Sequence, residues 1–232
     1  MEEIIDERPE LVFIQETWLK TLKSDATSIV KDYGYVLVHE IRKNIEKETG
    51  GGVGIMIKLG MKYEPVKQRK YSSFEHIVVR IPIKSCTPLL VISIYRVLFV
   101  PVNVFLEEFV TLLEILVTMK ENFVIAGDIN IHMDAIEIYS SKFNDILDSF
   151  NLQQHVEFPT HIRGHTLDVI ITNNEVPCIS KVGAKEYHDI SHHSLVSFNV
   201  NVTPLVKTEK RITFRNIKGI ILQNSQMKWR EC

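Results

Sequence analysis

The sequence predicts an α+β domain in which two mostly antiparallel β-sheets pack face to face, flanked by helices. Strand-like runs outnumber helical ones, Gly, Pro and charged residues separate most of them, and two segments with helical spacing interrupt the series. An order of strands, helix, strand, helix and strands is typical of paired sheets with helices outside. With 232 residues, 45% of them hydrophobic, the chain is long enough to bury one sizeable core.

The expected strands are short β-branched or alternating runs, which fit a pleated and partly buried surface. In chain order they are Leu11–Gln15, Tyr35–Val38, Val53–Ile57, Phe74–Ile81, Leu89–Tyr95, Phe123–Ala126, Val169–Thr172 and Ser194–Phe198. We expect the runs between Tyr35 and Tyr95 to form a series of hairpins.

Two helices are expected from apolar residues spaced three and four apart. In Val104–Lys120 the glutamates lie off a single apolar stripe, which consists of Phe105, Phe109, Leu112, Leu113 and Leu116. A second stripe consists of Phe143, Ile146, Leu147 and Phe150. Both stripes are most simply explained as core packing.

Asp128 and Asn130 follow the apolar run Phe123–Ala126 and Gly127. Alternate positions at a strand end point to the same side, so an acid and an amide are expected to face one site. A carboxylate there can bind a divalent cation or take a proton from water, and an amide can hold an oxygen of the reacting group. By itself, an Asp after a Gly is as often a turn former or a helix cap.

Other acids and histidines also stand next to apolar runs. Glu16 follows Leu11–Gln15, Asp168 opens Val169–Thr172, and His192 and His193 precede the last strand. Strand ends that carry Glu, Asp with Asn, Asp and His supply oxygen ligands for a hard cation, a base for water and a group to meet a phosphate. Together they predict a metal-assisted phosphodiester hydrolase.

At these residues the sequence resembles the endonuclease/exonuclease/phosphatase superfamily, and most closely the endonuclease domain of non-LTR retrotransposons, itself similar to apurinic/apyrimidinic endonucleases. The resemblance runs from about residue 8 to 200, with its motifs in family order. The matching stretches are Phe13–Leu19, Gly50–Ile55, Ser93–Arg96, Gly127–Asn130, Thr166–Thr172 and Ser191–Val196. It implies a four-layer sandwich like that of deoxyribonuclease I.

The resemblance also implies roles for individual residues. Glu16 would bind the metal, Mg²⁺ with Mn²⁺ as an alternative, and Asp128 would activate the attacking water. Asn130 would position the phosphate or the water, and Tyr95 would contact the phosphate, although a half-buried strand tyrosine is an equally good explanation of Tyr95.

Asp168 would orient His193, which would stabilise charge on the phosphoryl oxygens or act as an acid. A carboxylate beside an imidazole fixes its tautomer and favours its protonated form, which agrees with this role.

Two departures from the family weaken the inference to activity. The family has an Asp before the final His, whereas this chain has His192, so an oxygen ligand of the metal is replaced by a nitrogen that magnesium prefers less. The family also opens with a strand that carries an Asn, and Met1–Pro9 shows no such strand, so the chain is expected to begin after it. A catalytically inactive remnant that acts at most as a binding module is therefore the rival interpretation, and a phosphatase of small phosphoesters is a third.

We expect a family-like domain over residues 1–203 and a tail over 204–232 that resembles the linker before a reverse transcriptase. DNA is the expected partner, yet the net charge is −2, so any DNA-facing surface must be a local basic patch. The candidates are Lys67, Arg69 and Lys70, and, in the tail, Lys207, Lys210, Arg211, Arg215 and Lys218. Solvated charge runs are the commoner explanation of such groups.

Cys86, Cys178 and Cys232 are odd in number and lack metal-ligand spacing, which favours a reducing compartment. The acidic start has no secretory pattern, and the longest apolar stretch, Pro88–Val102, is interrupted by Arg96 and too short for a bilayer. We expect an intracellular protein, nuclear or cytoplasmic, without a membrane segment. No feature predicts an organic cofactor or an oligomeric state.

Two further motifs have simpler explanations. Gly50–Gly52 lacks the residues of a phosphate-binding loop and is better explained as a tight turn. His161, His165 and His193 match no standard zinc spacing. His188 and Asp189 precede the His192–His193 pair, and Asp189 would replace the missing carboxylate only if the register slipped by several residues.

Overall fold

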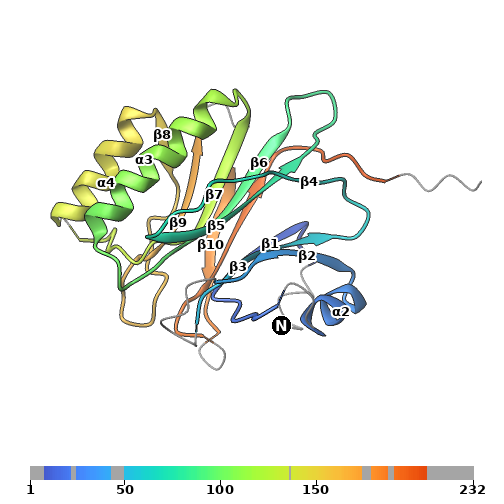
Figure 1. The fold of residues 1–232 in the computed structure, drawn as a ribbon, viewed down its shortest axis with the longest axis horizontal. Coiled ribbons are helices and arrows are strands. Elements are labelled where there is room, and N and C mark those ends of the chain that lie inside the picture. Colours follow the sequence, from blue (N-terminus) through green and yellow to red (C-terminus); the bar gives the residue numbers. More distant parts are fainter. Residues whose placement is uncertain are drawn as a thin grey trace, which may run out of the picture.

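The computed structural model describes residues 8–21, 25–42, 50–135, 137–173, 179–187 and 191–207, and its strands form three sheets between helices (Figure 1). The helices are α2 (Asp25–Asp32), α3 (Val102–Thr118) and α4 (Ile138–Ser149). The strands are β1 (Leu11–Gln15), β2 (Tyr35–Glu40), β3 (Val53–Lys58), β4 (Glu64–Pro65), β5 (Phe74–Ile81), β6 (Leu89–Arg96), β7 (Asn122–Asp128), β8 (Leu152–Gln154), β9 (Asp168–Asn173), β10 (Ile179–Lys185) and β11 (Leu195–Val200).

The largest sheet has six strands in the order β4-β5-β6-β7-β9-β8. All neighbours in it are antiparallel except β6 and β7, which are parallel and are connected through α3. A parallel pair needs such a crossover because consecutive parallel strands cannot be joined by a tight turn. The crossover brings the carboxyl ends of β6 and β7 to the same edge of the sheet.

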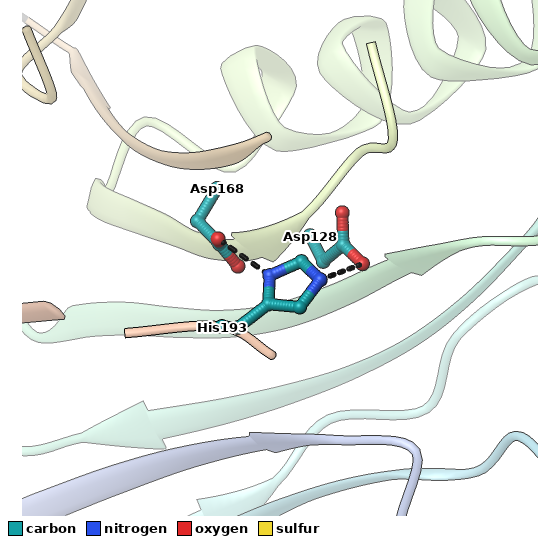
Figure 2. Close-up of side chains that lie close together, drawn as sticks. All are labelled: Asp128, Asp168 and His193. Carbon is teal, nitrogen blue, oxygen red and sulfur yellow. Dashed lines mark hydrogen bonds and ion pairs between the residues drawn. The ribbon is translucent and has the colours of Figure 1, made fainter. Parts of the chain in front are cut away.

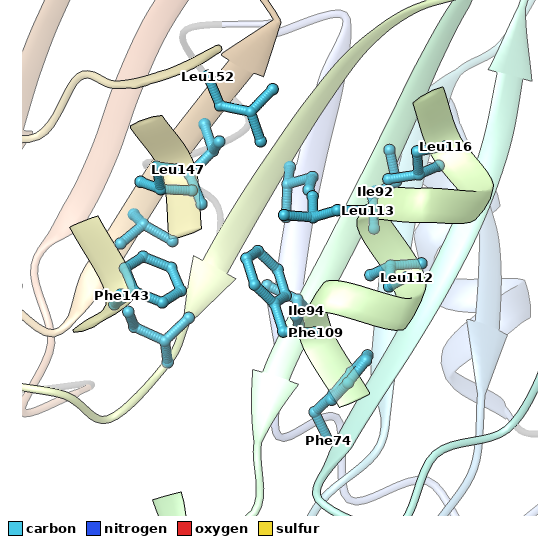
Figure 3. Close-up of a cluster of buried hydrophobic side chains, with 14 of the residues drawn as sticks. Phe74, Ile92, Ile94, Phe109, Leu112, Leu113, Leu116, Phe143, Leu147 and Leu152 are labelled. Atoms are coloured by element: carbon cyan, nitrogen blue, oxygen red, sulfur yellow. The ribbon is translucent and has the colours of Figure 1, made fainter. Parts of the chain in front are cut away.

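Helices α3 and α4 cover one face of this sheet (Figures 1 and 3). The expected stripe of α3 is buried there, and Phe105, Phe109 and Phe143 pack with ring centroids 5.2–6.2 Å apart. Full burial of such a side chain is worth about 1.5–3 kcal/mol, so this core holds the helices on the sheet. Both expected helices are present, although α3 begins two residues earlier than predicted, after Pro101.

The opposite face of the six-stranded sheet packs against two smaller sheets. One has the order β1-β3-β2 and the other consists of β10 and β11. The core between the layers includes Ile55, Val79, Val91 and Val124. Helix α2 packs on the outer side of the three-stranded sheet through Val30, so the layers are helix, sheet, sheet and helix. The predicted fold class is confirmed, whereas α2 and the short or exposed strands β4, β8 and β10 had not been expected.

The edges of β1 and β11 face a shared cavity of about 970 Å³. Within the described residues β1 pairs only with β3, and β11 only with β10. Phe13 and Phe198 reach across with ring centroids 6.1 Å apart, over a floor that includes Val91 and Val124. Residues 1–7, where the sequence shows no opening strand, lie outside the described residues.

The expected boundary after residue 203 falls in a segment that still pairs with the body. Pro204 forms a bridge with Ile83 and Val206 forms one with Met61. Residues 208–232, which contain the basic positions beyond Lys207, lie outside the described residues. Among the helices that the structure describes, none is long and apolar enough to cross a membrane.

Candidate active site

Tyr95, Asp128 and Asp168 form a row across three adjacent strands. Tyr95 of β6 is the register partner of Asp128 in β7, and Asp128 is the partner of Asp168 in β9. Side chains at paired positions project from the same face of a sheet. All three therefore stand on the inner face, at the end of the core between the sheets.

The turn after β7 is built around the Asp128 carboxylate. It accepts the Asn130 backbone N–H at 2.8 Å and the Asn130 side-chain amide at 3.0 Å. Asn130 adopts a φ of +50°, a left-handed conformation that asparagine tolerates better than most residues. The buried Arg96 guanidinium holds the turn by donating to the carbonyls of Ile129 at 2.7 Å and Asn130 at 3.0 Å. The Asp and Asn predicted to face one site thus bind each other.

Gly127 is required immediately before Asp128. Its φ of +150° is open to glycine, and a Cβ there would lie 1.9 Å from the carbonyl oxygen of Ile94 in the neighbouring strand. The absence of a side chain therefore allows β6 and β7 to approach closely where their carboxyl ends present Tyr95 and Asp128.

His193 lies between two carboxylates, as Figure 2 shows. Its Nδ1 is 2.9 Å from Asp168 Oδ2, and its Nε2 is 3.9 Å from Asp128 Oδ2. The buried hydroxyl of Thr160 accepts the backbone N–H groups of Leu167 and Asp168. The backbone carbonyl of Thr160 accepts the N–H of Ser194 at 2.7 Å. Thr160 therefore fixes Asp168 and the His193 segment relative to each other.

Asp128 is 7% exposed, and its neighbours shift the pKa of its carboxyl group in opposite directions. Burial, followed by the charge of Asp168, raises the pKa of Asp128 to about 7, although His193 opposes the shift. Burial alone lowers the pKa of His193, but the hydrogen bond to Asp168 and the nearby carboxylates raise it above its usual value. The site thus favours a cationic imidazole beside a carboxyl group that exchanges its proton near neutral pH.

Glu16 reaches the same site from the end of β1. Tyr95 donates a hydrogen bond from its hydroxyl to Glu16 Oε1. Burial, this bond and the charge of Glu16 raise the pKa of Tyr95 above its usual value, so the hydroxyl keeps its proton as a donor. This contact joins the smaller sheet to the row on the larger one.

Gly51 and Gly52 hold the loop that carries Glu16. The backbone N–H of Thr17 donates to the carbonyl of Gly52 at 3.0 Å, and the backbone N–H of Trp18 donates to the carbonyl of Gly51 at 2.8 Å. Both glycines have positive φ, and a Cβ on Gly52 would lie 2.4 Å from Thr17 Oγ1. The tight turn expected at this position therefore has a supporting role at the site.

Within the described residues, one group of acidic and histidine side chains is compact enough to hold a metal ion, namely Asp128, Asp168 and His193. Glu16 faces this group through Tyr95, and its charge contributes to the pKa shifts of Asp128 and His193. Three carboxylates and the Asn130 amide are the oxygen donors that a hard divalent cation prefers, and a cation would relieve the repulsion that raises the pKa of Asp128. The donor set fits magnesium or manganese.

His192, expected as a metal ligand, is exposed and lies against His161 with ring centroids 6.3 Å apart. His165 pairs with Asp134 at 3.2 Å and stacks on His132, so the described parts of the chain hold no metal-sized group of His161, His165 and His193. His188 and Asp189 lie outside the described residues.

The comparisons with known proteins agree with this geometry. The family model described as endonuclease/exonuclease/phosphatase matches residues 1–188. The chain belongs to this family. A search of curated proteins finds no match.

Solved structures of the endonuclease/exonuclease/phosphatase fold superpose over most of the chain. The endonuclease domain of TRAS1, a telomere-specific non-LTR retrotransposon, is 15% identical with a TM-score of 0.66, over 86% of this chain and 88% of that one. An AP endonuclease from Archaeoglobus fulgidus is 16% identical with a TM-score of 0.58, over 87% and 92%. The catalytic domain of Xenopus laevis APE2 is 12% identical with a TM-score of 0.60, over 90% and 88%. At these identities the likeness shows the fold.

Some residues that build this site had not been singled out from the sequence. Arg42 pairs with Glu75 at 2.5 Å, lies 5.8 Å from the centroid of the Tyr95 ring and stands two residues after the end of β2. Glu75 also accepts the Gly52 backbone N–H at 2.6 Å and is the register partner of Tyr95. A polar residue inside the apolar run of β5 was the signal available for Glu75, whereas nothing in the local sequence distinguishes Arg42 from the other arginines.

Proposed function

We propose that this family member is a divalent-metal-dependent DNA endonuclease domain of retrotransposon origin, which nicks a strand by hydrolysing a phosphodiester bond. The observation that carries the proposal is the placement of His193 between Asp168 and Asp128, beside Glu16 and Tyr95. The structural likeness to the TRAS1 endonuclease domain and to AP endonucleases supports DNA as the substrate.

In the proposed reaction Asp128 takes a proton from the attacking water. Its pKa of about 7 suits this task, because a general base works best when its pKa lies near the working pH. The water oxygen forms a bond to phosphorus while the bond to the leaving oxygen breaks. The leaving oxygen takes a proton from solvent, so one end of the nick carries a phosphate and the other a hydroxyl. Asn130, tied to Asp128 by two hydrogen bonds, positions the water or the phosphate.

His193 and Tyr95 act on the phosphate oxygens. Asp168 keeps His193 protonated, so its Nε2–H faces developing negative charge, where a fixed donor lowers the barrier most. The Tyr95 hydroxyl remains a donor because its pKa is raised. Glu16 would hold the cation, whereas His192, the other expected ligand, is exposed beside His161. A bound divalent ion supplies a Lewis acid for a non-bridging phosphate oxygen.

The test is nicking of supercoiled plasmid by the purified chain with Mg²⁺ or Mn²⁺ and with EDTA. Asp128→Ala should lower the metal-dependent rate by about 10²–10⁴-fold, since it removes the base. Asp145→Ala removes an exposed carboxylate on α4 and serves as the matched control. Equal nicking by wild type and Asp128→Ala would assign the activity to another site or to a contaminant.

The rival proposal is an inactive member that keeps the fold, and the observation that favours it is His192. A nitrogen ligand in place of an oxygen weakens magnesium more than manganese binding. His192→Asp should therefore raise magnesium-dependent nicking. If a folded His192→Asp chain cuts with neither metal, the inactive-member proposal replaces the endonuclease proposal.

A further inference from the structure

A second pocket, of about 480 Å³, lies beside the candidate active site and is lined by the loop before β5, the end of β2 and the chain after β6. Its inner wall includes Glu75, the register partner of Tyr95. Directly opposed residues of neighbouring strands lie about 5 Å apart, so this wall is one residue away from the row that carries Asp128.

Unpartnered polar atoms gather in the lining of this pocket. Four buried atoms of its lining residues have no hydrogen-bond partner among the described residues, namely Arg42 Nη2, Gln68 Oε1, Tyr71 OH and His76 Nε2. His76 is only 6% exposed. This burial lowers the pKa of His76 to about 4, so its imidazole is neutral near pH 7. A buried polar group without a partner costs about 1–3 kcal/mol, so four around one pocket point to a polar ligand that both donates and accepts.

The charge and aromatic content of the pocket restrict the class of that ligand. Its lining has four basic side chains, Arg42, Lys67, Arg69 and Lys70, against two acidic ones, Glu40 and Glu75, although the chain as a whole carries −2. Lys67, Arg69 and Lys70 are exposed at the rim, and Arg69 lies 5.8 Å from the centroid of the Tyr71 ring. The rim therefore suits an anion, and Phe99, which is 51% exposed, adds an aromatic surface of the kind on which bases stack.

The loop that forms the pocket is firmly anchored. The Glu108 carboxylate on α3 accepts hydrogen bonds from both the backbone and the hydroxyl of Ser72 and Ser73. The Tyr71 ring stacks on Phe74 with centroids 4.5 Å apart, and the Gln68 amide donates to the carbonyl of His76 at 3.1 Å. These contacts fix the side chains that surround the pocket before any ligand binds.

We propose that this pocket binds one nucleotide of the DNA strand next to the scissile phosphate, with its base against Tyr71, Gln68 and His76 and its phosphate on Lys67 and Arg69. The inference rests on the proposed function and adds to it a subsite that reads a base. The base supplies the donors and acceptors that Gln68 Oε1, Tyr71 OH and His76 Nε2 lack among the described residues. The exposed cations fix the backbone on either side.

The experiment measures binding of a labelled single-stranded oligonucleotide to the full chain by fluorescence anisotropy in EDTA, where nothing is cut. Tyr71→Phe removes only a hydroxyl and should weaken binding about three- to tenfold, the size of one buried hydrogen bond. Tyr139→Phe is the matched control, because Tyr139 lies on α4, outside the lining of this pocket, and also has a cation, Lys142, over its ring. The same strand made of abasic sugar-phosphate should bind both variants as it binds the wild type.

Arg69→Ala should weaken both the normal and the abasic strand and lower the slope of log affinity against log salt by about 0.7, as expected for one phosphate contact on a single strand. Lys142→Ala should leave the slope unchanged. The exposed Lys67→Glu tests the phosphate contacts a second time, with loss of affinity for both strands expected.

The inference is overturned if Tyr71→Phe binds like Tyr139→Phe, or if Tyr71→Phe weakens both strands equally. Plasmid nicking by the same preparations separates this result from the proposed function. A chain that nicks but shows no Tyr71 effect retains the function and loses the subsite, whereas a chain with the Tyr71 effect that never nicks retains a base-binding pocket and loses the nuclease.

Discussion

Asp128 has a carboxyl group that the folded chain prefers to keep protonated. Its folded pKa of about 7 exceeds the ordinary aspartate value of 3.8 that applies to the unfolded chain, first because it is buried and then because Asp168 is its neighbour. The folded state therefore holds a proton that the unfolded state releases, and stability falls as the pH rises from about 4 to about 7. The raised pKa that suits Asp128 to act as a general base therefore lowers the stability of the fold near neutral pH.

Asp128→Asn should consequently stabilise the metal-free chain above pH 7. Each pH unit between the two pKa values corresponds to about 1.4 kcal/mol, so a gain of a few kcal/mol is expected there and little near pH 4. Urea unfolding in EDTA at both pH values measures the difference, with Asp145→Asn on the exposed face of α4 as the control for lost charge. A gain of equal size at pH 4 and pH 8 would contradict a raised pKa for Asp128.

Asp168→Asn tests how His193 acts. With the carboxylate replaced by an amide, the pKa of His193 should fall, and the loss of activity that follows its deprotonation should begin at a lower pH. Asp134→Asn is the matched control, because Asp134 pairs with His165 Nδ1 at 3.2 Å outside the site. If Asp168→Asn leaves the pH–rate profile unchanged and instead lowers metal affinity, Asp168 is a ligand and not the orienting group of His193.

At the scale of the elements, strand register gathers the site. The sequence predicted that Tyr95, Asp128 and Asp168 stand at strand ends, because each borders an apolar run. It did not predict that the three are register partners, since pairing between β6, β7 and β9 depends on the crossover through α3. Helix α2 escaped prediction because it has eight residues and buries only Val30, and β10 because its side chains are mostly exposed.

Gly127→Ala should damage both the fold and the site, because the new Cβ would meet the backbone of β6 at the point where the register is set. We expect a loss of about 2–4 kcal/mol in unfolding free energy, from the unfavourable φ together with the clash. Gly60→Ala is the matched control, since Gly60 also has positive φ but nothing lies within 4 Å of its added Cβ. Equal destabilisation of the two variants in urea would show that the close approach of β6 and β7 has no energetic weight.

At the scale of the whole molecule, the site connects the three-stranded sheet to the six-stranded sheet. Few features of the sequence predict that these two sheets meet there. Glu16 comes from the end of the three-stranded sheet, while Tyr95 and Asp128 belong to the six-stranded sheet. The family resemblance predicted that all three residues belong to one site. The hydrophobic pattern alone predicted only that each lies at the end of a strand. Arg42 and Glu75, which connect the layers next to Tyr95, are 33 residues apart and could not be paired without the fold.

Because the carboxylates come from both layers, a cation bound among them should stabilise the whole chain. A ligand that binds only the folded state at 100 times its Kd adds about 2.7 kcal/mol, which for a chain of this size raises the melting temperature by about 5–10 °C. We expect a rise with Mn²⁺ as well as with Mg²⁺, because both ions accept the carboxylate oxygens of this site. Glu16→Gln keeps the shape, removes one charge and should reduce the rise, while Glu114→Gln on α3 should not. Melting curves at constant ionic strength decide the matter: an equal rise in wild type and Glu16→Gln would place the cation elsewhere, and Glu16 would then be a partner of Tyr95 alone.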